Sequence, residues 1–301
     1  MAFARPSPFA FAALMAACAL LPLTTALAQE GGTLAKVKAS GAITFGYRES
    51  SFGFSYLDAN LKPVGYSIDI CNRIVDAIKT ELRMPSLEVR YQAVTSANRI
   101  PLVANGTVDI ECGSTTNLVE RQKQVAFSPI VFVAGTRLLV KRGSPIRSYR
   151  DLAGRTVAVT AGTTNEKAMQ EIARRFKLDF RILEQKDHSE SYARLAEGKA
   201  DAFATDDVLL FGLIAQNKAQ KQYQVVGEFL SYDPYGIMFR KGDAQLAELV
   251  KRAFHDLAED GEIERQYKRW FLQRLPSGQS LDLPMSPQLE TLVRAMAARP
   301  E

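Results

Sequence analysis

Short runs of strand-forming residues alternate with longer amphipathic segments through most of the chain, and no other feature constrains its fold as strongly. Residues 43–47 form one such short run, and residues 68–82 follow with apolar side chains at Ile70, Ile74 and Ile78. Apolar residues at this spacing lie on one face of a helix. Repeated alternation of strands and helices predicts an α/β fold with largely parallel sheets.

The alternation occurs in two series, and each is long enough to form a lobe. In the first series we predict two helices, at 68–82 and 99–105, a small hairpin turning at 58–60, and strands at 43–47, 87–94 and 108–111. In the second series we predict helices at 165–176, 189–197 and 208–216, and strands at 137–140, 156–160, 180–183 and 202–205. After a strand at 235–239 the rest is predicted to be helical, with a last helix that Ser286 caps and Pro287 begins.

The N-terminus has the pattern of an export signal. Arg5 precedes an apolar run at 9–23, and an Ala-Leu-Ala sequence at 26–28 supplies the small residues of a cleavage site. The run is shorter than the roughly 20 apolar residues that a membrane span needs. We therefore predict a signal peptide at 1–28 and a periplasmic mature protein. Lipid modification at Cys18 remains an alternative.

Charge and cysteine content exclude several classes of function. The formal net charge is +5, and the basic residues are scattered without interleaved aromatic residues, so we expect no nucleic-acid partner. The two histidines and the two cysteines beyond the leader lack metal-ligand spacing, so we expect no metal and no cofactor. Cys71 lies on a predicted helix and Cys112 at a strand end. We favour two buried thiols, although an oxidising compartment leaves a disulfide open.

Polar side chains follow the predicted strands of both series, where open α/β sheets bind ligands. A guanidinium binds a carboxylate through two charge-assisted hydrogen bonds, and an aspartate can pair with an ammonium. Hydroxyls and helix N-termini satisfy the remaining carboxylate oxygens. The candidate ligand-binding residues are Arg48, Ser96, Arg99, Ser114, Thr116, Arg121, Thr164, His188 and Asp206. Each alone could be a surface residue or a helix cap, so the pattern by itself indicates a two-lobed binder of an anionic ligand.

Several blocks of sequence resemble one known family. They are GYRESS at 46–51, TSANRIPL at 95–102, ECGSTTN at 111–117, VERQK at 119–123, GTT at 162–164, KDH at 186–188 and DD at 206–207. In this order and spacing the chain is similar to the family 3 solute-binding proteins of ABC transporters, from Thr33 to about Ala298. Within that family it resembles the members that bind acidic amino acids. Tyr47 and Ala97 depart from the family pattern without removing a proposed ligand.

The resemblance implies a two-lobed periplasmic-binding-protein fold of type II, with the ligand cleft between the lobes. The first lobe would comprise 29–134 and 232–301, and the second lobe 135–231. Hinge strands are expected at 132–136 and 231–235. The lobes would close around the ligand by a hinge motion.

The resemblance also implies a ligand and partners. The ligand would be L-glutamate or L-aspartate, the partners would be the permease and ATPase subunits of an ABC transporter, and the protein would act as a monomer. Arg121, Thr116 and Thr164 would hold the α-carboxylate, while Ser114 and Asp206 would hold the ammonium. The side-chain carboxylate would contact Arg48, Ser96, Arg99 and His188.

Three other functions remain as alternatives. The first is an enzyme on the same fold, such as a periplasmic dehydratase of the cyclohexadienyl type, for which Glu49 and His188 would be the candidate acids or bases. The arginines and His188 are better explained as carboxylate ligands, so we expect no enzyme. The second is a sensor module for a membrane kinase, but the chain carries no kinase segment. The third is a binder specialised for another amino diacid, such as cysteate.

Overall fold

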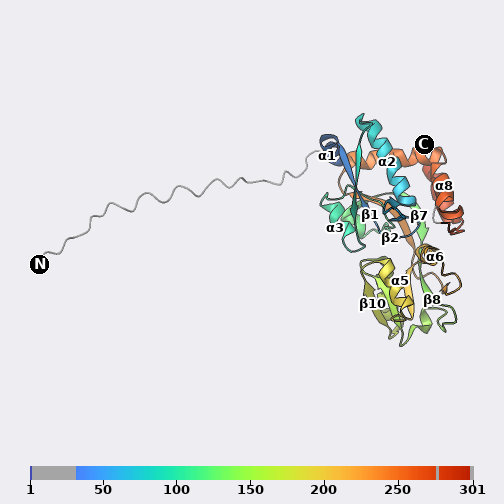
Figure 1. Cartoon of the computed structure of the whole chain (residues 1–301). Coiled ribbons are helices and arrows are strands. Elements are labelled where there is room, and N and C mark those ends of the chain that lie inside the picture. Colours follow the sequence, from blue (N-terminus) through green and yellow to red (C-terminus); the bar gives the residue numbers. More distant parts are fainter. Residues whose placement is uncertain (2–31, 276–277, 299–301) are drawn as a thin grey trace. The chain divides into compact units, whose positions relative to one another are not determined.

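The computed structural model describes residues 32–275 and 278–298 together with Met1 (Figure 1). The predicted cleavage site after Ala28, the apolar run before it and Cys18 lie outside the described residues. No helix in the described part combines the length and the apolar character that a membrane span requires.

The first lobe is built on a five-stranded sheet with the strand order β5-β1-β6-β13-β7. β1 (Ala42–Tyr47) pairs in parallel with β5 (Glu88–Ala93) and β6 (Ile110–Glu111). β13 (Asp233–Arg240) runs antiparallel to β6 and to β7 (Val125–Ala134). A small antiparallel sheet of β2 (Ser50–Ser51), β3 (Ser55–Leu57) and β4 (Pro63–Val64) confirms the predicted hairpin.

Helices cover the first sheet, and an aromatic core lies between them and the strands. They are α1 (Gly32–Ser40), α2 (Tyr66–Leu82), α3 (Arg99–Ala104), α7 (Ala244–Glu259), α8 (Glu262–Tyr267), a π-helical turn (Lys268–Leu272) and α9 (Pro287–Ala297). Phe54 makes edge contacts with Tyr66, Phe132 and Tyr235. α9 begins as predicted, because the Ser286 side chain accepts a hydrogen bond from the Leu289 N–H and Pro287 follows it.

The second lobe has its own five-stranded sheet, in the order β10-β9-β11-β8-β12 (Figure 1). β9 (Thr156–Thr160) is parallel to β10 (Arg181–Gln185) and β11 (Ala202–Asp206). β8 (Thr136–Lys141) is antiparallel to β11 and to β12 (Tyr223–Val226). The helices of this lobe are a 3₁₀ turn (Tyr149–Leu152), α4 (Thr164–Phe176), α5 (His188–Ala196) and α6 (Asp207–Gln216). The fold is therefore α/β and two-lobed, as predicted.

The chain passes twice between the two sheets, and the two passages lie against each other. β7 ends at Ala134 and β8 begins at Thr136, while β13 begins at Asp233 after the chain leaves the second lobe. The Thr136 N–H donates to the Ser231 hydroxyl at 2.9 Å, so the passages are hydrogen-bonded. The lobe boundaries and hinge segments given above stay predictions.

The expectation of two free thiols is wrong. Cys71 on α2 and Cys112, the residue after β6, form a disulfide with their Cα atoms 6.1 Å apart. The pairing follows from packing, because α2 lies over the sheet and the Ser67 hydroxyl also donates to the Gly113 carbonyl at 2.8 Å. A helix and a strand end 41 residues apart give no sign of this contact in the sequence.

Candidate functional site

Eight of the nine predicted ligand residues meet at one enclosed space between the lobes. The first lobe supplies Arg48, Ser96, Arg99, Ser114 and Thr116, and the second lobe supplies Thr164, His188 and Asp206. The remaining volume is about 10 Å³, which is room for about one water molecule. A ligand larger than a water molecule would enter this space only after the lobes separate or the side chains move.

Two arginines of the first lobe reach this space without enough hydrogen-bond acceptors. Arg48 follows β1 and is 1% exposed, and neither of its Nη atoms has a hydrogen-bond partner among the described residues. Arg99 begins α3 and is 2% exposed, and its Nε is likewise unpartnered in the described part of the chain. Burial, and then the charge of Arg99, lower the pKa of Arg48 to about 10, so both guanidinium groups stay cationic at neutral pH. Buried cations with free donors favour an anionic ligand.

Arg121 is the predicted residue that does not line the space. It lies at the rim, on a 3₁₀ turn (Arg121–Lys123), and donates from Nη1 to the Thr116 carbonyl at 3.0 Å. Its Nη2 donates to the Gly162 carbonyl at 3.3 Å, which links the first lobe to the turn before α4. Burial and the Arg99 charge lower the pKa of Arg121 to about 10. To bind a carboxylate, this guanidinium would exchange a carbonyl contact for the ligand.

Asp206 ends β11 and is bonded across the lobes. It accepts hydrogen bonds from the Tyr235 hydroxyl of the first lobe and from Asn165 Nδ2 of its own lobe, the latter at 2.8 Å. Burial, and then the charge of Asp233, raise the pKa of Asp206 to about 8. A ligand ammonium beside this carboxyl group would favour its ionised form.

His188 begins α5 and is held by hydroxyl groups behind it. Its Nδ1 lies 2.9 Å from Thr160 Oγ1, and that oxygen lies 2.9 Å from Ser191 Oγ. Burial, followed by the charges of Arg48 and Arg99, holds the pKa of His188 well below its usual value, so the ring is neutral. With Nδ1 engaged, Nε2 is the nitrogen that remains for a ligand.

Several residues of the site escaped the sequence analysis. Asn165 lines the space and orients Asp206, while Tyr235 closes over the same carboxyl group. Glu111 and Thr115 lie behind Arg99, whose Nη1 donates to Thr115 Oγ1 at 2.5 Å. Glu111 and Thr115 fall inside the block at 111–117, but nothing in that block distinguishes them from strand and turn residues.

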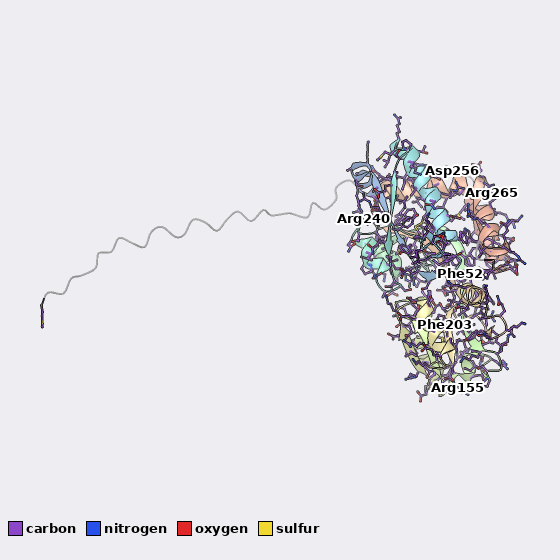
Figure 2. The ribbon with its side chains drawn as sticks, in the orientation of Figure 1. Phe52, Arg155, Phe203, Arg240, Asp256 and Arg265 are labelled. Atoms are coloured by element: carbon purple, nitrogen blue, oxygen red, sulfur yellow. A yellow bond between two sulfur atoms is a disulfide. The ribbon has the colours of Figure 1, made fainter. Side chains whose placement is uncertain are left out.

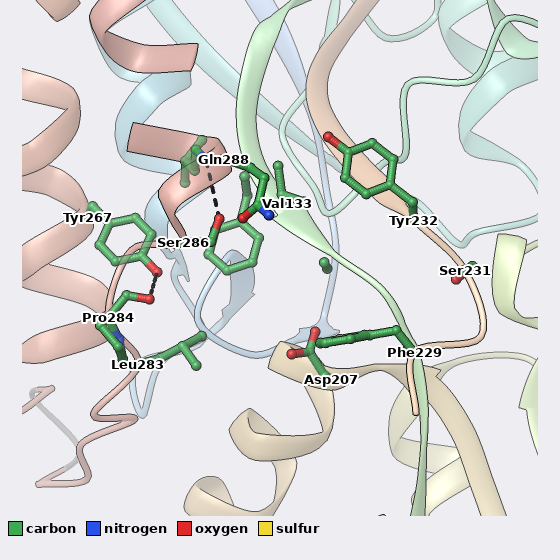
Figure 3. A pocket seen from close by; sticks show the side chains of 13 residues that line it. Val133, Asp207, Phe229, Ser231, Tyr232, Tyr267, Leu283, Pro284, Ser286 and Gln288 are labelled. Atoms are coloured by element: carbon green, nitrogen blue, oxygen red, sulfur yellow. Dashed lines mark hydrogen bonds between the residues drawn. The ribbon is translucent and has the colours of Figure 1, made fainter. Parts of the chain in front are cut away.

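A larger pocket of about 380 Å³ lies beside the end of β7 and the segment that precedes β13 (Figure 3). It is lined by aromatic and aliphatic side chains, among them Phe229, Tyr232, Tyr267 and Leu283. Asp207 is the one charged residue among its described lining residues. A pocket whose described lining has no cation is poorly suited to a carboxylate ligand, whereas the smaller space between the lobes is lined by two buried arginines.

The sequence model of the bacterial extracellular solute-binding proteins, family 3, matches residues 43–273. The chain belongs to this family. One relative, a Pseudomonas aeruginosa protein named L-glutamate/L-aspartate-binding protein, is 47% identical over 264 residues, covering 87% of each chain. An Escherichia coli glutamate/aspartate import solute-binding protein is 41% identical over 291 residues, covering 96% of each chain.

Solved structures of other binding proteins share the family 3 fold. An ancestral arginine-binding protein bound to glutamine superposes with a TM-score of 0.69 at 31% identity, covering 77% of this chain and 99% of that one. An ancestral amino acid-binding protein, described as a precursor of cyclohexadienyl dehydratase, has a TM-score of 0.68 at 28% identity, covering 79% and 99%. The relatives compared in sequence are named as binding proteins.

Proposed function

We propose that this family 3 protein binds L-glutamate and L-aspartate in the periplasm and delivers them to the permease and ATPase of an ABC importer. The observation that carries the proposal is the pair of buried arginines, Arg48 and Arg99, which line the space between the two lobes and have donors without partners among the described residues. A neutral side chain would bring no anion to these buried cations, which is unfavourable. The names of the two curated relatives support the same ligands.

The ligand would lie across the site with its two ends in different surroundings. Its α-carboxylate would reach Arg121, Thr116 and the N-terminus of α4 at Thr164, where the free N–H groups of the helix favour an anion. Its ammonium would contact Ser114 and Asp206. Its side-chain carboxylate would take up the free donors of Arg48 and Arg99, with Ser96 and the neutral His188 completing the shell.

The mechanism we propose is hinge closure of two lobes, 29–134 with 232–301 and 135–231. Thr116 Oγ1 and Thr164 Oγ1 lie 3.4 Å apart across the cleft, and Arg121 reaches the Gly162 carbonyl. These contacts hold the closed arrangement, so ligand entry requires them to open. The proposed export signal at 1–28 would bring the protein to the importer, and one chain carries the whole cleft, so we propose a monomer.

An enzyme is less well supported by this geometry. Glu49, a candidate acid or base, is exposed and does not line the enclosed space. His188 is engaged at Nδ1 and lies beside two cationic arginines, which suits a carboxylate ligand. We therefore propose binding and transport as the function, with cysteate as a further ligand because its sulfonate carries one negative charge.

Isothermal titration of the mature protein tests the proposal. Glutamate and aspartate should bind at a single site, while glutamine and lysine should bind at least a hundredfold more weakly, because a buried unpaired charge costs about 3 kcal/mol or more. Glutarate, which lacks the ammonium, is the matched control for Asp206 and should bind more weakly than glutamate. Equal affinity for glutamine and glutamate would refute the proposed specificity.

A further inference from the structure

A third ionisable group lies directly behind the two buried arginines. Glu111 ends β6 and is 0% exposed. Its Oε2 accepts a hydrogen bond from Thr115 Oγ1 at 2.6 Å, and its Oε1 lies 4.0 Å from Arg99 Nη1. Oε1 has no hydrogen-bond partner among the described residues.

The backbone closes over this carboxylate and holds it in place. A Cβ atom built on Gly113 would lie 2.2 Å from Glu111 Oε1 and 2.9 Å from Arg48 Cγ, so any side chain at 113 would displace one of them. Thr115 donates to Glu111 and accepts from Arg99, which connects the three groups in a chain. In this arrangement Glu111 is buried behind Arg99 and is bonded to Thr115.

The charges at this end of the site sum to one positive unit. Arg48 and Arg99 are cations, Glu111 is an anion, and Ser96 and Thr115 are uncharged. His188 is neutral, because burial and the two arginines lower its pKa. The charge of Glu111 favours the cationic form of both arginines and so offsets part of their burial.

One cation and two other carboxyl groups act on this region from outside it. The cation is Arg121, whose guanidinium donates to the Thr116 and Gly162 carbonyls and which we assign to the α-carboxylate. Asp187 is half-buried and caps α5 by accepting a hydrogen bond from the Glu190 N–H at 3.0 Å, so solvent screens its charge. Asp206 accepts hydrogen bonds from Tyr235 and Asn165, and its charge also favours the cationic form of Arg99. We assign Asp206 to the ligand's ammonium, so it is not counted among the groups around the side-chain anion.

We propose that Glu111 sets this end of the site to one net positive charge and thereby selects an amino acid whose side chain carries one negative charge over one whose side chain carries two. The inference rests on the proposed function, because it refines the choice among acidic ligands. A second ligand charge would be buried near Glu111 without a cation to balance it, and charges a few ångströms apart interact strongly at a site screened from water.

Two ligands of the same shape separate this effect from size. Cysteate carries a sulfonate with one charge, and 2-amino-3-phosphonopropionate carries a phosphonate that is largely dianionic at about pH 8. The wild-type protein should bind cysteate at least about tenfold more tightly than the phosphonate, as expected for one unbalanced charge near an effective dielectric constant of about 20. This measurement requires no variant.

The Glu111→Gln variant removes the charge and keeps an oxygen that can accept from Thr115. It should move the phosphonate-to-cysteate affinity ratio toward the phosphonate by at least about tenfold. Asp243→Asn is the control, because Asp243 is another buried carboxylate of the first lobe, it caps α7 far along β13 from the site, and asparagine also caps helices. The control should leave the ratio unchanged, and melting curves should show both variants folded.

The outcomes distinguish this inference from the proposed function. If wild type binds neither glutamate nor cysteate, the proposed function fails. If wild type binds glutamate but prefers the phosphonate, or if Glu111→Gln folds and keeps the wild-type ratio, the role of Glu111 is refuted while the binding function stands. Should Glu111→Gln not fold, a wild-type preference for the phosphonate still refutes the role of Glu111, and a wild-type preference for cysteate supports selection of a single charge at this end of the site.

Discussion

The two lobes contribute different chemistry to one cleft. The first lobe supplies all three arginines of the proposed site, together with the buried carboxylate of Glu111. The second lobe supplies Thr164, His188 and Asp206, and no lysine or arginine of that lobe is among the described residues lining the space. Under the proposed function, the first lobe would select the charge of the ligand and the second lobe would contribute the groups that close on it.

The apolar cores of the two lobes also differ, in size and in composition. The first lobe has one large core in which aromatic rings such as Phe54, Phe132 and Phe271 touch one another, and a smaller aliphatic cluster that contains Val103. A disulfide ties α2 to the strand ends of the site. The second lobe has two smaller, mainly aliphatic clusters on the two sides of its sheet, one of them containing Phe203 (Figure 2). Burying unpaired cations is unfavourable. The first lobe buries Arg48 and Arg99, and it is also the lobe with the larger apolar core and the disulfide, both of which stabilise it.

The largest expected effect separates two arginines of the first lobe. Arg121→Ala should weaken binding of glutamate, aspartate and glutamine alike, by about 2–5 kcal/mol, because it removes the contact to the α-carboxylate that all amino acids share. Arg99→Ala should lower glutamate affinity and reduce the preference over glutamine. Titrations of both variants with glutamate and glutamine give the comparison. Identical selectivity in the two variants would contradict the assigned roles.

Removing the disulfide tests whether the first lobe depends on its covalent link. A Cys71→Ser, Cys112→Ser double variant should lower the free energy of unfolding by about 2–4 kcal/mol, because the bond closes a loop across 41 residues. Glutamate affinity should change much less, since neither sulfur lines the site. Urea unfolding and titration measure the two quantities. A larger loss of affinity than of stability would show that the bond instead positions Arg99 or Ser114.

The second lobe should be tested through Asp206. Asp206→Asn keeps the shape and should weaken glutamate binding by about 1.5–3 kcal/mol, the usual contribution of a hydrogen bond to a charged group. Saturating glutamate should reduce the radius of gyration of wild type in small-angle scattering, and this compaction should be smaller in the variant. Asp207→Asn, which alters the adjacent carboxylate outside the enclosed space, is the matched control and should behave like wild type. Tight binding by wild type without compaction would exclude hinge closure.

The smallest expected effect on ligand binding is the pH dependence that Asp206 confers. Its pKa in the folded protein is raised to about 8, against about 4 when unfolded, so the folded state binds the extra proton between these values. The stability of the ligand-free protein should therefore fall as pH rises through this window, and Asp206→Asn should remove that slope. Glutamate affinity should rise severalfold from about pH 6.5 to about pH 8, because the ammonium pairs with the ionised form. A wild-type affinity that does not change with pH would show that Asp206 is already ionised before the ligand binds.

Most elements could be predicted because their signals are local. Helical periodicity located α2, and the cap at Ser286 located the start of α9. β7 was missed over most of its length, because Pro129 lies inside it and proline argues against a central strand. In the structure β7 is the edge strand of its sheet, and its pairing with β13 contains register shifts. A proline, which has no N–H to donate, is tolerated at such a position.

The sequence by itself determined the two-lobed α/β fold and eight of the residues that meet in the cleft. Strand ends in open sheets converge, so polar side chains placed after strands gather without further information. Only the tertiary structure decided that Cys71 bonds Cys112, that Tyr235 closes on Asp206, and that Glu111 lies behind Arg99. The first two contacts join elements that lie apart in sequence, and the third depends on how α3 packs against the end of β6. Their geometry is set by packing, and local sequence patterns do not record it.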